Sequence, residues 1–548
     1  MTNESTDNVR QAPVRQAPVL IIGGGPVGLA LAAELGLRGI ECLLVEQGNG
    51  EIYHPRANTI NSRTMEFCRR WGIADKVRNS GAPPDFPLDI LYLTSLQGHL
   101  VAHIPRPTYG GDKPLPTTPE RSQRCNQTFF DPILRELADS FPSVTLRYQC
   151  RFESFVETDS GVTATVRDVA TDRTETIEAE YLVSCCGGQS PAPKALGMQW
   201  EGTPVLSHNL NVFLRIPELW NHHDMANTAF YFFVDPEGGN QSLIEIDGNS
   251  LWRMGLDFGQ EKVVPEEIDI DAKVKRWVGP DVPYEIISAL PWTCRSIVAD
   301  CWQKGRVFLA GDAVHQHSPQ GGFGMNTGLG DAVNLAWKLA ATLEGWGGPG
   351  LLESYQPERL PVARQIVHQA TIMQNETVEG ENSAVIADDT PEGEEARRVV
   401  GEDIIRERTQ IFVSDGIVLG VKYDPSPIVW DDGTPPPEKS VTTYVPTARA
   451  GWRAPHAWVS EGKSTLDLFG RGFVLLIFGG DASGLVKAAA TRHVPLETVK
   501  INDPEIAALY EKKLVLVRPD GHVAWRGDTS PDDPMQVIDV VRGALTAP

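Results

Sequence analysis

A glycine-rich turn near the start of the chain constrains its fold more than any other feature. The turn, GGGPVG, follows an apolar run at 19–22 and precedes an Ala/Leu-rich stretch with helical character. In such a turn the first glycine of a GxGxxG pattern permits the bend out of a strand. The second lets the backbone approach a pyrophosphate, and the third lets the helix pack against the sheet. The residues predicted to form this site are Gly23, Gly25, Pro26, Val27 and Gly28.

An acidic residue at a suitable distance strengthens this interpretation. A second apolar run at 42–45 ends at Glu46, which lies 23 residues after Gly23. A carboxylate at this distance can bind the hydroxyl groups of a ribose, while the helix N-terminus offers N–H groups to the phosphates. We therefore predict a βαβ unit that binds a dinucleotide, with Glu46 and the adjacent Gln47 at the ribose. The motif alone does not distinguish FAD from NAD.

Length and composition limit the class of protein. A chain of 548 residues exceeds what a single hydrophobic core supports, so we expect about two to four domains. The net charge of −23 disfavours nucleic acid and anionic membranes as partners. No apolar run is long enough to span a membrane, and eight cysteines without a CxxC spacing are typical of the cytoplasm. The polar segment 1–17 is expected to be a disordered leader.

A second motif follows about three hundred residues later, in RVFLAGDAVHQHSPQGGFGMNTGLGDAVNLAWKLA at 306–340. An apolar strand ends at Gly311 and Asp312, and a Gly/Pro-rich loop then leads into a helix that begins near Gly324. An aspartate at the end of a strand can accept hydrogen bonds from a sugar-like chain. A helix N-terminus preceded by glycines can stabilise a ligand that acquires negative charge, as a reduced flavin does.

With this motif the sequence resembles a known family, the single-component FAD-dependent aromatic hydroxylases. The stretches HPRANTINSRTMEFCRRWG and RCNQTFFDPILRELA are also similar to that family. The resemblance implies that FAD is the cofactor, with Arg56 near its pyrophosphate and Gln127 at the linker of the flavin. It places Gly311 and Asp312 at the ribityl and pyrophosphate portion. The residues that it places beside the isoalloxazine ring are Pro319, Gly324, Met325 and Asn326.

The C-terminal third resembles the branch of phenol, chlorophenol and polyketide hydroxylases, through GWRAPHAW and LVLVRPDGHVAWRG. The expected fold is α/β: a Rossmann-type FAD-binding domain, an inserted mixed β-sheet substrate domain and a C-terminal thioredoxin-like domain. We expect the FAD-binding domain at 18–200 and 296–400, the substrate domain at 201–295, a linker at 401–440 and the last domain at 441–548. No cysteine follows Cys301, so the last domain cannot perform dithiol chemistry and is expected to serve packing or dimerisation.

The resemblance implies a monooxygenase that hydroxylates a phenolic or polycyclic aromatic substrate. NAD(P)H, as a transient reductant, would reduce FAD, and O2 would then give a flavin C4a-hydroperoxide. In phenol-type relatives a catalytic base lies two residues after the family arginine; here that position is Asn58, so we assign no catalytic residue and predict no metal site. The substrate candidates are Asn58, Tyr231 and Pro319. Baeyer–Villiger oxidation and a non-catalytic flavin-binding relative remain open, as does a homodimer.

Two adjacent cysteines mark a departure from the family. In YLVSCCGGQSPAP, Cys186 occupies the position of a family aspartate, Gln189 that of an arginine, and Pro193 that of a further basic residue. The family associates this stretch with FAD and NAD(P)H contacts. Three other interpretations are weaker. A vicinal disulfide would close a strained eight-membered ring, and a metal site would need further ligands, which do not lie nearby. A redox pair would need a partner motif, which is lacking. We predict altered handling of the nicotinamide cofactor.

Overall fold

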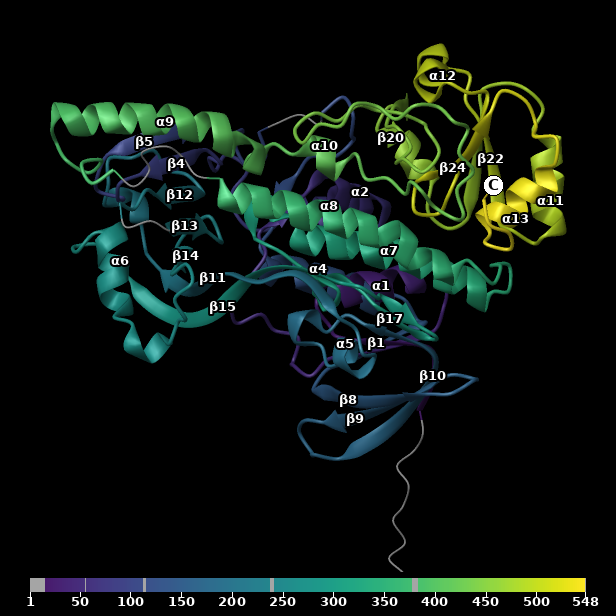
Figure 1. Cartoon of the computed structure of the whole chain (residues 1–548), viewed down its shortest axis with the longest axis horizontal. Coiled ribbons are helices and arrows are strands. Elements are labelled where there is room, and N and C mark those ends of the chain that lie inside the picture. Colours follow the sequence, from purple (N-terminus) through teal and green to yellow (C-terminus); the bar gives the residue numbers. More distant parts are fainter. Residues whose placement is uncertain (1–14, 55, 112–114, 237–240, 377–382, 548) are drawn as a thin grey trace, which may run out of the picture.

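Three larger sheets, flanked by helices, form the part of the chain that the computed structural model describes (Figure 1). This part comprises residues 15–54, 56–111, 115–236, 241–376 and 383–547. Most of the predicted leader therefore lies outside the described residues. The first strand begins at Arg15, so residues 15–17 belong to the sheet and not to a leader. Among the described residues, no helix combines the length and apolar character needed to cross a bilayer.

The first sheet contains the predicted βαβ unit. Its order is β16-β17-β10-β1-β2-β7, and β8 and β9 extend it as an antiparallel hairpin next to β10. Strands β1, β2, β7, β10 and β17 run parallel. The strands are β1 (Arg15–Ile22), β2 (Cys42–Val45), β7 (Val144–Arg147), β8 (Cys150–Glu157), β9 (Val162–Asp168), β10 (Thr174–Ser184), β16 (Gln303–Lys304) and β17 (Val307–Leu309). The apolar runs at 19–22 and 42–45 are confirmed as strands.

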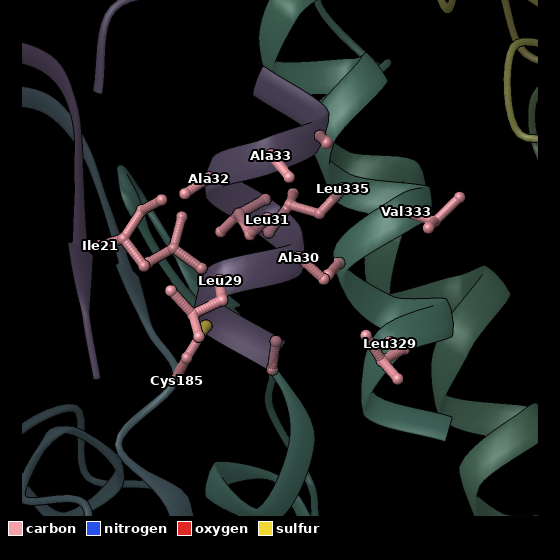
Figure 2. Close-up of a cluster of buried hydrophobic side chains, with 14 of the residues drawn as sticks. Ile21, Leu29, Ala30, Leu31, Ala32, Ala33, Cys185, Leu329, Val333 and Leu335 are labelled. Carbon is pink, nitrogen blue, oxygen red and sulfur yellow. The ribbon is translucent and has the colours of Figure 1, made fainter. Parts of the chain in front are cut away.

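Two helices from distant parts of the sequence pack against each other beside this sheet (Figure 2). Helix α1 (Pro26–Leu37) follows the glycine-rich turn, and α7 (Gly324–Leu343) begins where the second motif predicts a helix. Leu29 and Leu31 of α1 and Leu329 of α7 are each at most 1% exposed. Burial of a leucine contributes about 1.5–3 kcal/mol, so this contact joins the two predicted motifs into one core.

The second sheet is mixed and has the order β18-β15-β11-β14-β13-β12-β4-β5. Its strands are β4 (Ile90–Leu93), β5 (Leu100–Ile104), β11 (Trp200–Arg215), β12 (Phe230–Phe233), β13 (Gln241–Glu245), β14 (Leu251–Asp257), β15 (Glu285–Ala299) and β18 (His315–Gln316). Strands β4 and β5 lie inside the range expected for the FAD-binding domain, yet they complete this sheet. Helix α9 (Pro391–Phe412) packs on β5 and crosses the boundary expected at residue 400.

The third sheet, β22-β21-β23-β24, forms the C-terminal domain at one end of the molecule (Figure 1). Its strands are β21 (Phe473–Ile477), β22 (Leu496–Lys500), β23 (Leu514–Val517) and β24 (Val523–Gly527). Helices α11 (Ser483–Thr491), α12 (Pro504–Tyr510) and α13 (Pro534–Val541) alternate with these strands as the sequence predicts. The remaining paired strands are β3 (Thr59–Ile60) with β6 (Gln123–Arg124) and β19 (Trp458–Ser460) with β20 (Lys463–Ser464).

The remaining helices lie between these sheets or on their outer faces. They are α2 (Ser62–Arg70), α3 (Ala74–Arg78), α4 (Gln127–Asp139), α5 (Ala192–Ala195), α6 (Ile270–Val278), α8 (Tyr355–Asn375) and α10 (Asp415–Val418). Buried ion pairs dock the C-terminal domain on α2 and α8: both guanidinium Nη atoms of Arg518 bind Glu358, and Arg453 binds Glu66. The C-terminal domain is therefore joined to α2 and to α8, the helix that follows the second motif.

Candidate active site

The glycine-rich turn has the geometry of a phosphate cradle. Gly23 has φ of +105°, and a Cβ atom there would lie 2.5 Å from the carbonyl oxygen of Cys185. A Cβ atom on Gly28 would lie 2.0 Å from the carbonyl oxygen of Gly23, so only glycine fits at both positions. A Cβ atom on Gly25, by contrast, would meet nothing within 4 Å. This open space, next to the N-terminus of α1 at Pro26, fits a pyrophosphate.

Glu46 fixes the loop next to this cradle. Its carboxylate accepts a hydrogen bond of 2.7 Å from the backbone N–H of Gly24 and another of 2.7 Å from that of Gly48. Each carboxylate oxygen retains a lone pair that can accept a ribose hydroxyl group. The following residue, Gln47, is exposed. Glu46 and Gln47 therefore remain the candidates for a ribose site.

The family stretches around Arg56 and Gln127 lie side by side. Strands β3 and β6 pair, and the N–H of Gln127 donates to the carbonyl oxygen of Ala57 at 2.9 Å. The guanidinium of Arg56 is exposed, and the side chain of Gln127 donates to Asp131 Oδ2 at 3.0 Å. The other oxygen, Asp131 Oδ1, is buried and has no hydrogen-bond partner among the described residues. An unsatisfied acceptor beside an exposed arginine fits a bound ligand that brings hydroxyl and phosphate groups.

The loop of the second motif is tied to both helices. A Cβ atom on Gly311 would lie 3.0 Å from Val27 Cγ2, so the two predicted glycine motifs touch at this point. The N–H of Gly311 donates to Asp331 Oδ2 at 3.1 Å, and Asp312 beside it is exposed. Asn326 donates to the carbonyl oxygens of Thr59 and Gly322. The loop of the second motif therefore contacts the start of α1 at Val27 and the segment after Arg56 at Thr59.

The two histidines of this loop differ in their surroundings. His315 is fully buried and its Nε2 lies 2.8 Å from Asp331 Oδ2, as a structural role predicts. His317 Nδ1 lies 2.6 Å from the carbonyl oxygen of Ser318, and its Nε2 is buried without a partner among the described residues. Burial lowers the pKa of His317 to about 4. His317 is therefore neutral near pH 7, and its Nε2 can accept a hydrogen bond. A Cβ atom on Gly324 would lie 3.5 Å from this Nε2.

One face of the second sheet carries a row of side chains that the sequence did not single out. The strand registers align Ser288, Phe213, Arg253, Ile244 and Phe230 across five neighbouring strands. The neighbouring residues of β14, by alternation, are buried in the sheet's hydrophobic core. The row is therefore apolar apart from one cation and one hydroxyl group.

This row faces the loop that contains the family arginine. Arg253 donates to the carbonyl oxygen of Arg56 at 2.9 Å, and His54 Nδ1 lies 2.8 Å from Ser288 Oγ. Burial and the neighbouring positive charge of Arg124 lower the pKa of Arg253 to about 10. Arg253 Nε is buried and has no partner among the described residues. A flat aromatic molecule that carries an anionic group would complement this face.

The substrate candidates predicted from the sequence lie in different places. Tyr231, predicted to contact the substrate, is 0% exposed in the sheet core, where its hydroxyl group donates to the carbonyl oxygen of Ala226. Its neighbour Phe230 lies on the opposite face, because alternate residues of a strand point to opposite sides. Asn58 accepts a hydrogen bond from the side chain of Asn126, and Pro319 is exposed in the loop of the second motif.

The paired cysteines lie directly under the glycine-rich turn. Cys185 is buried, and the thiol of Cys186 donates to the carbonyl oxygen of Ile22 at 3.5 Å. Burial raises the pKa of the Cys186 thiol, so the group is protonated at neutral pH. Gln189 is exposed. Cys186 is thus a neutral side chain at the position where the family resemblance implies a carboxylate.

Comparison with known proteins identifies the family. A model described as FAD binding domain matches residues 16–370, and one described as aromatic-ring hydroxylase, C-terminal, matches residues 447–548. Tetracenomycin A2 monooxygenase-dioxygenase of Streptomyces glaucescens is 32% identical over 565 residues, covering 94% of each protein. Phenol 2-monooxygenase of Pseudomonas sp. is 30% identical over 603 residues, covering 98% of this chain and 94% of that protein.

Solved structures lead to the same conclusion. Chromopyrrolic acid-soaked RebC with bound 7-carboxy-K252c is 43% identical, with a TM-score of 0.91, and the match covers 97% of this chain and 100% of that chain. The rebeccamycin biosynthetic enzyme RebC is also known with reduced flavin. The protein therefore belongs to the FAD-dependent aromatic-ring hydroxylases. It is an FAD-dependent monooxygenase of the branch that contains phenol and polyketide hydroxylases, as the sequence predicts.

Proposed function

We propose that the protein hydroxylates a polycyclic aromatic compound that carries a carboxylate. Three features support this proposal: the open space at Gly25, the cofactor residues that converge on it, and the sheet face around Arg253. The bound FAD would supply the oxygen-activating chemistry, with NAD(P)H as the reductant and O2 as the oxidant. The proposed substrate class rests on one observation: in the cross-strand row, Arg253 is the single cation between apolar side chains.

The protein's own residues would position the cofactor. Gly25 and the first turn of α1 would receive the pyrophosphate, Glu46 and Gln47 the ribose, and Arg56 the phosphates from the other side. Gln127, Gly311 and Asp312 would contact the chain that joins the phosphates to the flavin. Pro319, Gly324, Met325 and Asn326 would lie along the ring, where the N-terminus of α7 stabilises negative charge.

The substrate would lie between this ring and the sheet face. Phe213 and Phe230 offer aromatic surface for a planar molecule, and the guanidinium of Arg253 offers a partner for its carboxylate. RebC, whose soaked ligand is an acid by its printed name, supports this substrate class. Asn58 cannot accept a proton as the base of phenol-type relatives does, so a substrate that is already electron-rich is favoured.

The domain organisation forms part of the proposal. The first sheet with α1, α4, α7 and α8 would be the discontinuous FAD-binding domain, and the second sheet the inserted substrate domain. The C-terminal domain is proposed to be thioredoxin-like, since it combines a parallel β21–β22 pair with antiparallel β23 and β24. With no cysteine after Cys301 it would serve packing and not dithiol exchange.

A matched pair of ligands tests the substrate class. Anthraquinone-2-carboxylic acid and anthraquinone are titrated into the FAD-loaded protein, and binding is followed through the flavin absorbance. Arg253→Met should weaken binding of the acid about tenfold to a hundredfold and leave the neutral compound unchanged, because one charge-assisted hydrogen bond is lost. Arg173→Met, at an exposed arginine, serves as the matched control. Equal binding of the two compounds by the wild type would contradict the role of the carboxylate.

A further inference from the structure

A cavity lies behind the loop of the second motif, between the FAD-binding domain and the C-terminal domain. It offers about 40 Å³ to the centre of a water-sized molecule, and each such molecule needs about 10–15 Å³ on this measure. Helices α2, α7, α8 and α10 and the segment around Asp520 form its walls. The cavity is therefore large enough for a diatomic gas molecule.

The cavity is lined by apolar as well as polar side chains. Six of the apolar ones are at most 8% exposed: Phe323, Val333, Val362, Ile366, Ile417 and Val418. Phe323 belongs to the loop of the second motif, and the other five come from α7, α8 and α10. These side chains form an apolar part of the wall that can contact a small apolar molecule.

The charged groups in the wall already have partners. Arg359 binds Asp331, the carbonyl oxygen of Thr327 and the hydroxyl group of Tyr423. The carboxylate of Asp520 accepts from both Arg518 and Asn334. A water molecule needs about two to four polar partners, so these committed groups do not favour hydration of the cavity.

Two further polar side chains of the wall are similarly engaged. Arg63 donates to Glu66 and to the carbonyl oxygen of Asp520. His522 Nδ1 lies 3.1 Å from the carbonyl oxygen of Gly451, and its ring stacks on Tyr423 at 4.1 Å between centroids. The space that remains in the cavity is thus bounded mainly by carbon atoms.

The cavity shares wall residues with the loop that is proposed to contact the flavin. Asn326, which lines the cavity, also accepts from the N–H of Asn61 and donates to the carbonyl oxygens of Thr59 and Gly322. Phe323 and Thr327 lie in the same turn. Phe323 and Asn326 belong to the segment 319–326, and Thr327 follows it directly. This segment would contact the flavin ring.

We propose that this cavity holds dioxygen, the apolar co-substrate, before it reaches the flavin. The inference rests on the proposed function, because only a reduced flavin consumes the gas. Dioxygen makes weak hydrogen bonds and gains free energy when it leaves water for an apolar space, as other small apolar molecules do. The position behind Phe323 and Asn326 places this store next to the site of use.

Xenon binding tests the cavity without reference to catalysis. Crystals of the FAD-loaded protein are pressurised with xenon, and we expect a xenon site bounded by Val418, Phe323 and Val362. Val418→Phe should remove this site, whereas Ile417→Val, which removes one methylene group, should retain it. Ordered water in place of xenon in the wild type would overturn the proposal.

The oxidation of the reduced flavin tests the use of the cavity. After anaerobic reduction with dithionite, Val418→Phe should react with O2 severalfold more slowly than wild type, with unchanged FAD content. Val486→Phe, at a residue that is 40% exposed on α11, should match wild type. If Val418→Phe does not fold, Val418→Ile and Val333→Ile fill less of the cavity. Both should also slow the reaction of the reduced flavin with O2.

The outcomes separate this inference from the proposed function. Xenon in the wild type together with an unchanged O2 rate in the filled variants would overturn the inference while leaving the monooxygenase intact. A second outcome is a slower reaction with O2 in the filled variants than in the wild type, but no product from any carboxylated polycycle. This outcome would retain the inference and contradict the proposed substrate.

Discussion

His315 Nε2 lies 2.8 Å from Asp331 Oδ2, with both side chains fully buried beneath the loop of the second motif. Arg359 Nε binds the other carboxylate oxygen at 2.8 Å. Burial alone would raise the pKa of Asp331, but Arg359 and His315 hold it below its ordinary value, so the carboxylate is charged. This carboxylate links the loop to α7 and α8, and it explains how a Gly/Pro-rich loop has a fixed conformation.

Asp331→Asn should destabilise the protein and lower its FAD content. The change leaves Arg359 buried without its charged partner, which typically costs about 3–5 kcal/mol. Urea unfolding gives the free energy, and the absorbance of the purified protein gives the FAD content. Asp532→Asn, at an exposed aspartate, is the control. A loss below about 1 kcal/mol would contradict the role of Asp331.

Glu46→Gln should weaken FAD binding about tenfold to a hundredfold. The neutral amide retains the shape but loses the charge-assisted hydrogen bonds from the N–H groups of Gly24 and Gly48. Titration of FAD into the apoprotein, followed by fluorescence, measures the dissociation constant. Glu41→Gln, at an exposed residue before β2, should bind like wild type. Equal affinities for the Glu46 variant and wild type would exclude Glu46 from the site.

His522→Gln should make the free energy of unfolding less dependent on pH in the acidic range. Burial lowers the pKa of His522 to about 3, from an ordinary value of 6.5. Between these values the unfolded chain binds a proton that the folded protein does not, so stability falls as pH falls from about 6.5 to 3, by up to about 1.4 kcal/mol per pH unit. Urea unfolding across this range should show a shallower slope for the variant. His493→Gln, at an exposed histidine, should retain the wild-type slope.

Arg453→Met should destabilise the junction with the C-terminal domain. Arg453 is 1% exposed and binds Glu66, whose buried carboxylate would then keep only Arg63 as a charged partner, at a cost of about 1.5–3 kcal/mol. The double variant Arg453→Met with Glu66→Gln should recover part of this loss, because the charge is removed. Thermal unfolding of both variants provides the comparison. A double variant less stable than the sum of the single changes would contradict this explanation.

Cys186→Asp combined with Gln189→Arg should accelerate reduction of the flavin by NAD(P)H. The two changes introduce the carboxylate and the guanidinium that the family resemblance implies below the glycine-rich turn, which is the physical reason for the prediction. Stopped-flow measurement of the flavin absorbance follows the reduction directly. Cys301→Ser, a control outside the motif, should be reduced at the wild-type rate. An unchanged rate would show that this stretch does not control the reductive step.

The glycine-rich turn and the βαβ unit could be predicted from the sequence, because each feature there is local. The pattern around Gly23, Gly25 and Gly28 depends on backbone space within one turn, and Glu46 follows at a fixed distance. The contact between Val27 and Gly311 was not predicted, since no local pattern connects residues so far apart. The structure supplies this contact through the packing of α1 on α7.

The substrate side could not be predicted in the same way. Tyr231 and Phe230 are adjacent aromatic residues in FYFF, and only strand register decides which of them faces the core. Arg253 was a visible signal, as a cation within the apolar run LWRMGLDF, but its neighbours Phe213 and Ile244 come from other strands. The membership of β4 and β5 in the second sheet also depends on long-range pairing with β12.

The most direct test of the central claim is the fate of oxygen in a single turnover. The FAD-loaded protein is reduced anaerobically with NADPH or NADH and mixed with ¹⁸O2 and a panel of polycyclic aromatic acids, and the products are analysed by mass spectrometry. We expect one labelled oxygen atom in a hydroxyl group on the ring of a carboxylated product, with the carbon skeleton unchanged. Label inserted into an expanded ring would instead indicate Baeyer–Villiger oxidation. Hydrogen peroxide as the sole product across the panel would contradict the account.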